Sequence, residues 1–181
     1  MNLTVVCWAA WVGTCIANLS CDQKRIGAQP VQAKEENSRK SGTQTRGNVE
    51  PNAVNALKTL LSTEDCASMY KLPEVWKKAL SDIERKSLVA LLQERVDSLA
   101  QVKLTDYADL CVLSRCKSGR MQFHGHGPML DQDVFLEGGR CAWALENLLD
   151  LTLPAIEEDL SKEELDKRAA SARSLVTSAI R

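Results

Sequence analysis

Residues 81–99 read SDIERKSLVALLQERVDSL, the clearest helix signal in the 181-residue chain. Ser81 and Glu84 stand three residues apart, as a capping box at a helix N-terminus requires. The apolar residues that follow recur every three or four positions, which places them on one face of a helix. They are Leu88, Leu91, Leu92, Val96 and Leu99. The stretch therefore predicts an amphipathic helix that buries this face.

The residues before this predicted helix also carry apolar side chains at helical spacing. Residues 54–61 carry apolar side chains every three or four positions, and the run stops near Ser62 and Thr63. Pro73 suits the first position of a helix, because the amide hydrogen that it lacks would have no partner there. A second helix is therefore expected from Pro73, with an apolar stripe that reaches Ile83.

The last part of the chain predicts two more helices. One contains Cys141 and Leu149 and ends before Pro154, because a residue that precedes proline is pushed out of the helical conformation. The other follows a second capping box, Ser161 with Glu164. Its apolar face consists of Leu165, Ala169, Ala172, Val176 and Ala179.

The segment between these regions fits more than one structure. Thr105 suits the N-cap of a helix that would contain Cys111 and Cys116, although residues 110–113, LCVL, also fit a short buried strand. Residues 117–139 lack a helical period and contain five glycines and one proline. This composition is typical of a long loop or a small hairpin.

These elements predict a mostly α fold, a small irregular bundle of about five helices with one long Gly-rich loop or small hairpin. The pattern L-x-x-L-L occurs at Leu57, Leu88 and Leu145, and the second interval is nearly twice the first. Helical-repeat arrays instead keep one fixed period. A HEAT-like or TPR-like array is therefore the less favoured alternative.

Residues 1–21 have a different pattern. Residues 3–17 contain no charged side chain, and this is the length of the apolar region of a signal peptide. Extended to Leu19, the run has seventeen residues, the lower limit for a membrane-spanning helix. Residues 1–21 are therefore predicted to be an export signal. A retained membrane anchor and a segment packed into the fold are the alternatives.

Two cysteines in this segment are candidates for lipid attachment. Residues 18–21, NLSC, resemble a bacterial lipobox with Asn where Leu is usual, and residues 12–15, VGTC, resemble one with Thr before the cysteine. Residues 15–17 instead offer small side chains for cleavage by a signal peptidase. We favour lipidation at Cys21, because an acylated cysteine followed by a polar tether is a common arrangement.

A polar tether is expected at residues 22–52, followed by the helical domain at residues 53–181. The tether has few apolar side chains and carries six basic against four acidic ones. It cannot bury enough apolar surface to offset a backbone entropy of roughly 1 to 2 kcal/mol per residue. Composition fits either a spacer between a membrane and the domain or an unstructured leader.

The overall composition excludes several classes of function. Lys and Arg number 23 and Asp and Glu number 24, for a formal net charge of -1. The chain therefore lacks the basic surplus of nucleic-acid-binding proteins, and no nucleic-acid partner is expected. The chain contains only two histidines, so few imidazole side chains are available for metal binding or histidine-based catalysis. No P-loop or dinucleotide fingerprint is present, so no cofactor is expected.

Four cysteines fall in the predicted domain, which in an exported protein suggests two disulfides. In one continuous helix from Thr105, Cys111 and Cys116 would point about 140° apart and lie too far apart to bridge. Cys141 would then pair with one of these two and Cys66 with the other. The alternative is four buried, reduced thiols that act as small apolar side chains.

A metal or catalytic site is the weaker hypothesis. His124 and His126 would point to the same side of an extended segment. Cys116 or Cys141 would have to complete a tetrahedral zinc or copper site. The catalytic sets would be Cys116 with His124, or either histidine with a serine and an aspartate of the same loop. Neither set has a local sequence signature, so we name no catalytic residue.

Basic side chains gather around the non-helical segment. They are Arg115, Lys117, Arg120 and Arg140. They make this segment the candidate for contact with a partner or an anion, because loops carry function more often than core elements do; a solvated loop without such a role is the alternative.

Together, these features predict an exported, membrane-tethered helical module, periplasmic or membrane-attached, that binds or scaffolds a protein partner. One alternative is an exported hydrolase or metal-dependent enzyme built on His124, His126 and a cysteine. The other alternative is an intracellular helical-repeat adaptor, in which the apolar N-terminal residues would belong to the fold.

Overall fold

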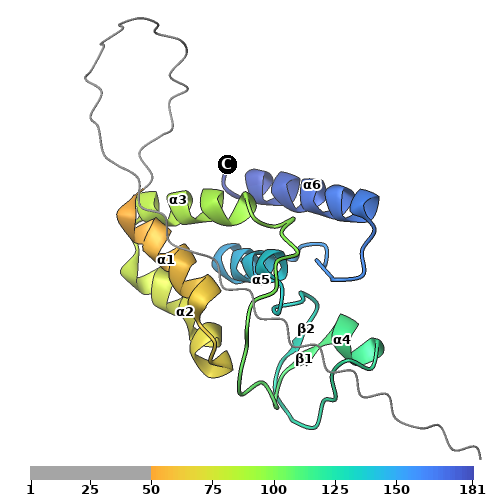
Figure 1. Cartoon of the computed structure of the whole chain (residues 1–181). Helices are drawn as coiled ribbons and strands as arrows, with labels where there is room; N and C mark the ends of the chain where they lie inside the picture. Colours follow the sequence, from red (N-terminus) through yellow and green to blue (C-terminus); the bar gives the residue numbers. More distant parts are fainter. Residues whose placement is uncertain (1–49) are drawn as a thin grey trace, which may run out of the picture. The chain divides into compact units, whose positions relative to one another are not determined.

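The computed structural model describes residues 50–181, which form six helices and one two-stranded parallel sheet (Figure 1). The helices are α1 (Pro51–Ser62), α2 (Cys66–Ala79), α3 (Asp82–Gln93), α4 (Leu113–Lys117), α5 (Glu137–Leu149) and α6 (Lys162–Ala179). The strands are β1 (Cys111–Val112) and β2 (Met129–Leu130). The prediction of a mostly α fold is confirmed. The predicted signal, the lipidation site Cys21 and the tether up to residue 49 lie outside the described residues. The prediction that the tether extends to residue 52 is wrong at its end, because Pro51 and Asn52 form the first turn of α1.

Helix α5 is the centre of the core, because α1, α2, α3 and α6 all contact it (Figure 1). Residues 138–145 of α5 are all buried, so this helix has no solvated face over two turns. A helix of this kind is stable only when other elements cover it on every side. Among residues 50–181, no helix combines the length and the hydropathy that crossing a membrane requires.

Both predicted capping boxes are confirmed. At the start of α3, the Ser81 amide donates to Glu84 Oε2 at 2.7 Å and the Glu84 amide donates to Ser81 Oγ at 3.4 Å. Ser161 and Glu164 repeat this exchange at the start of α6, at 3.1 and 3.3 Å. Hydrogen bonds from Asn52 and Ser81 lower the pKa of Glu84.

The prediction that Pro73 opens a helix is wrong. Helix α2 begins at Cys66, where the Asp65 carboxylate accepts a hydrogen bond from the Ser68 amide at 2.6 Å, and Pro73 lies buried in its interior. Asp65 is a strong N-cap, and it starts the helix two turns earlier than the proline.

Helix α3 is shorter than its apolar pattern predicts. It ends at Gln93, and the following residues form turns in which the Arg95 amide bonds to Leu92 O and the Ser98 amide bonds to Arg95 O. Val96 still reaches the core from this turn and is fully buried. Leu99, the last residue of the predicted apolar face, is exposed, so the sequence pattern predicts burial correctly only as far as Val96.

The predicted helix from Thr105 does not form. Thr105 instead pairs with Asp65, since its amide donates to Glu64 O at 2.5 Å and its carbonyl accepts from the Cys66 amide at 3.1 Å. Asp106 then adopts a left-handed conformation with φ of 53°, which a continuing helix cannot accommodate.

The alternative prediction of a short buried strand at LCVL is confirmed by β1. Cys111 pairs with Met129 and Val112 with Leu130 in a parallel register. The predicted small hairpin is therefore wrong, because hairpin strands are antiparallel and a parallel pair requires a longer connection. The intervening residues include the short helix α4 and the Gly-rich loop.

Candidate functional site

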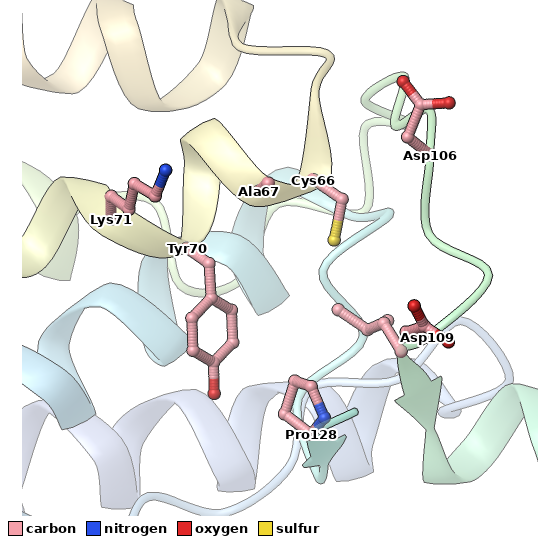
Figure 2. A pocket seen from close by; sticks show the side chains of 8 residues that line it. Cys66, Ala67, Tyr70, Lys71, Asp106, Asp109 and Pro128 are labelled. Atoms are coloured by element: carbon pink, nitrogen blue, oxygen red, sulfur yellow. The ribbon is translucent and has the colours of Figure 1, made fainter. Parts of the chain in front are cut away.

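A pocket of about 340 Å³ lies beside the N-terminal half of α2 (Figure 2). Three segments that are distant in sequence line it: α2 itself, the residues before β1 and the residue before β2. The lining residues are Cys66, Ala67, Tyr70, Lys71, Asp106, Asp109, Leu110 and Pro128.

Backbone hydrogen bonds hold the three segments together. The bridge between Asp65 and Thr105 fixes the start of α2 next to the residues that precede β1. The carbonyl of Pro128 accepts a hydrogen bond from the Cys111 amide at 3.0 Å, which joins the end of the Gly-rich loop to β1. The pocket is therefore a product of long-range pairing and not of one local motif.

The interior of the pocket is mostly apolar. Figure 2 shows the Cys66 sulfur, the Tyr70 ring and Pro128 around the same space. The Tyr70 ring also packs on Trp143 of α5, with 5.5 Å between the ring centroids. Burial raises the pKa of the Cys66 thiol, so this thiol stays neutral at pH 7 and is a weak nucleophile.

Charge is distributed unevenly around the opening. Asp106 and Asp109 lie on one side, and Lys71 lies across from them on α2 (Figure 2). Two carboxylates against one ammonium give the residues that line the pocket a net negative charge.

The His-Gly-His-Gly loop packs directly against Asp109. A Cβ atom at Gly127 would overlap the Asp109 carbonyl oxygen, and one at Gly125 would overlap its carboxylate oxygen Oδ1. Glycine is thus required at both positions for the close approach of the two segments. These glycines therefore position one wall of the pocket. The sequence predicted only that they belong to a loop or hairpin and gave no indication that they contact Asp109.

The four basic residues predicted as a contact cluster do not form one. Arg115 donates from Nε to both carboxylate oxygens of the buried Asp133 at 2.8 Å, and its guanidinium lies 4.6 Å from the centroid of the Phe135 ring. Burial raises the pKa of Asp133, and the Arg115 guanidinium opposes that rise. Arg115 is therefore a structural partner of the core and not a free anion ligand.

The other three basic residues have different environments. Arg120 pairs with Glu158 and, at 2.6 Å, with Asp159, and Lys117 is exposed. Arg140 is fully buried in α5, so it cannot contact a partner. Its guanidinium donates to the backbone carbonyls of Leu60, Thr63, Lys103 and Val134.

The predicted metal ligands are not brought together. His124 and His126 are exposed, whereas Cys141 is fully buried in α5 and burial raises the pKa of its thiol to about 12. Within residues 50–181, no group of three or more His, Cys, Asp or Glu side chains is placed to hold a metal ion. Asp133, an acid of the same loop, is engaged by Arg115 and not by a histidine.

The cysteine geometry differs from the prediction. Cys111 lies in β1 and Cys116 in α4, so the continuous helix that would have separated them does not exist. Their Sγ atoms lie 2.6 Å apart. Cys66, Cys111, Cys116 and Cys141 are all free thiols in this structure.

The pocket residues were missed at the level of sequence. Asp106 and Asp109 belong to the segment predicted as a helix, and Tyr70 and Lys71 precede the proline that was expected to start one. The only local sequence feature at the pocket is the run Asp-Tyr-Ala-Asp, which precedes the Gly-rich loop. This run is not typical of any particular kind of binding site. Comparisons with protein-family models, with curated proteins and with solved structures found no match to this chain.

Proposed function

We propose that this chain is an exported, membrane-tethered helical module whose pocket beside α2 binds a basic side chain of a protein partner. The observation that supports the proposal is the combination of an apolar interior with Asp106 and Asp109 on one side of the opening. Both aspartates are exposed, and neither has an ion-pair partner within residues 50–181.

A lysine or arginine side chain matches this arrangement. Its methylene stem would lie against Tyr70 and Pro128, while its charged end would reach the carboxylates. The Tyr70 ring adds an aromatic face, which attracts a cation in addition to the carboxylates. The cavity of about 340 Å³ is at the lower end of the range of roughly 300 to 1,000 Å³ for ligand pockets, which fits one side chain better than a large cofactor.

The membrane part of the proposal rests on residues 1–49. The uncharged residues 3–17 fit an export signal, Cys21 fits a lipid attachment site, and residues 22–49 have the composition of a spacer. In this arrangement the domain samples the space near the membrane surface, where it meets a partner protein.

Ligand titration of the full chain tests the pocket. A millimolar affinity corresponds to about 4 kcal/mol. Exposed ion pairs supply only about 0.2 to 1 kcal/mol each, so burial of the methylene stem must supply the rest. Single amino-acid derivatives are therefore expected to bind in the millimolar range or more weakly, which NMR shift perturbation detects. N-acetylarginine methylamide and N-acetyllysine methylamide are expected to shift the signals of Tyr70 and Leu110. N-acetylglutamate methylamide is expected not to shift them.

Matched variants assign the effect to the two carboxylates. Asp106→Asn with Asp109→Asn is expected to weaken binding at least about twofold, as the loss of two charge contacts of about 0.2 to 1 kcal/mol each predicts. Glu163→Gln with Asp166→Asn changes the net charge equally on the exposed surface of α6 and is expected to leave binding unchanged. Equal weakening of binding in both double variants would indicate general electrostatic attraction to the protein surface. That result would refute the proposal that the ligand binds in the pocket.

The intact mass of the protein from its native host tests export. Loss of residues 1–20 with added acyl mass on Cys21 is expected. Cleavage after Ala17 without added mass would keep export but refute the lipid anchor. A full-length, cytosolic chain would refute both, and would favour the alternative of an intracellular adaptor.

A further inference from the structure

We propose that Cys111 and Cys116 form a structural disulfide that closes the turn between β1 and α4. The Sγ atoms lie 2.6 Å apart, close to the bonded distance of about 2.05 Å, so a bond requires little movement of either side chain. This inference is independent of what binds the pocket.

The local backbone explains why the two sulfurs meet. β1 ends at Val112, which is extended with ψ of 113°, and α4 begins at the next residue. The change from extended to helical conformation reverses the chain between the two cysteines and returns Cys116 to Cys111. A continuous helix would keep the two thiols on different faces.

Both ends of the proposed bond are held in place. The Cys111 amide donates to Pro128 O at 3.0 Å, and the Cys116 carbonyl accepts from the Gly119 amide at 3.2 Å. Arg115, which precedes Cys116, is fixed by its two hydrogen bonds to Asp133. The chain entropy that usually opposes ring closure is therefore lost on folding, before the disulfide forms.

A small-molecule disulfide such as oxidised glutathione is a sufficient oxidant. Cys116 is half-buried and Cys111 is buried, so the Cys116 thiolate attacks first. This attack forms a mixed disulfide and releases one glutathione thiolate. The Cys111 thiolate then attacks the Cys116 sulfur and releases the second. Two protein thiols become one disulfide, one glutathione disulfide becomes two thiols, and the two protons pass to the leaving thiolates.

The environment fits a structural bond better than a catalytic one. Burial and the contact with Cys111 raise the pKa of Cys116 to about 11. Catalytic disulfides instead rely on a thiol whose pKa is lowered, because a stabilised thiolate is a good leaving group. Once formed, this disulfide is therefore expected to exchange slowly.

The disulfide would stabilise the turn between β1 and α4, on which several other contacts depend. β1 follows directly on the pocket residues Asp109 and Leu110, and α4 carries the Arg115 that holds Asp133. Joining β1 to α4 would thus stabilise one wall of the pocket together with the buried ion pair.

Peptide mapping of the oxidised full chain tests the proposal. The chain is incubated with oxidised glutathione, its remaining thiols are alkylated, and it is digested with trypsin under non-reducing conditions. Arg115 lies between the two cysteines, so cleavage there leaves two peptides that only a Cys111–Cys116 bond holds together. The mapping also separates this pair from pairs that involve Cys7, Cys15 or Cys21.

The expected result is one linked peptide pair, in the wild type and in the control Cys66→Ser. The melting temperature of the wild type is expected to rise by about 8 °C on oxidation, as closure of a six-residue loop predicts for a domain of this size. Cys116→Ser is expected to show no such rise. Full alkylation of Cys111 and Cys116 in the folded, oxidised wild type would overturn the proposal, as would a bond from either to another cysteine.

Discussion

Replacement of Arg140 by methionine is expected to cause a large loss of stability. Arg140 has no exposed surface, and its guanidinium is surrounded by backbone oxygens in place of carboxylates. The acceptors are Leu60 O at 2.9 Å, Thr63 O at 2.8 Å, Lys103 O at 3.1 Å and Val134 O at 3.1 Å. One side chain thus joins the C-terminal end of α1 to two segments that flank the core.

The size of the loss follows from these four carbonyls. A buried polar group that loses its partner costs about 1 to 3 kcal/mol. Water can reach some of the carbonyls, and methionine avoids the cost of burying a charge, so we take the lower end for each. The expected destabilisation of Arg140→Met is then about 4 kcal/mol. With a urea m value of about 2 kcal/mol/M, the unfolding midpoint would fall by about 2 M.

Urea unfolding of the full chain, followed by circular dichroism, measures this change. Arg85→Met is the matched control, because the Arg85 side chain is 38% exposed and pairs with an exposed aspartate; its midpoint is expected to change by less than about 0.5 M. Arg140→Lys keeps the charge, yet a single ammonium cannot reach all four carbonyls, so most of the loss is expected to remain. A lysine variant as stable as the wild type would refute the role of the guanidinium geometry.

Two further substitutions test the pocket wall and a buried acid. Gly127→Ala is expected to destabilise by about 1 to 3 kcal/mol, because its Cβ would meet the Asp109 carbonyl, and an unchanged urea midpoint would contradict the close approach. Burial raises the pKa of Glu146, whose Oε1 accepts hydrogen bonds from the Leu153 amide and the Gln132 side chain. The folded chain therefore retains this proton above the ordinary pKa of 4.5, and the contribution of Glu146 to stability falls as pH rises through that window. Glu146→Gln keeps the acceptor and is expected to reduce this fall in urea midpoints from pH 4 to pH 7, whereas parallel profiles for the two proteins would argue against it.

The elements with local signals were the predictable ones. The capping boxes at Ser81 and Ser161 each lie within one short stretch of sequence, and both begin the helices that they predict. The buried face of α6 also follows its sequence period, since Leu165, Ala169, Ala172 and Val176 are all buried, whereas Ala179, the last predicted member of the face, is exposed at the end of the helix. Such signals need no knowledge of the remaining chain.

Features that depend on distant partners were not predictable. Thr105 would cap a helix by its own chemistry, but its backbone pairs with the distant Asp65 and the helix is lost. Arg140 was predicted as a contact residue because it stands next to the non-helical segment together with other basic residues. Its acceptors come from three separate places in the sequence, the end of α1, Lys103 and Val134, and no local sequence pattern indicates them.

The central position of α5 also bears on how the chain folds during synthesis. Helices α1, α2 and α3 are complete once Gln93 has been made, yet the side of each that faces α5 stays uncovered until Leu149 has followed. α1 and α3 contact one another, but that contact alone leaves their apolar surface open to solvent. The contacts of α1, α2 and α3 with α5 can therefore form only after Leu149 has been synthesised, so the complete core depends on the last third of the chain.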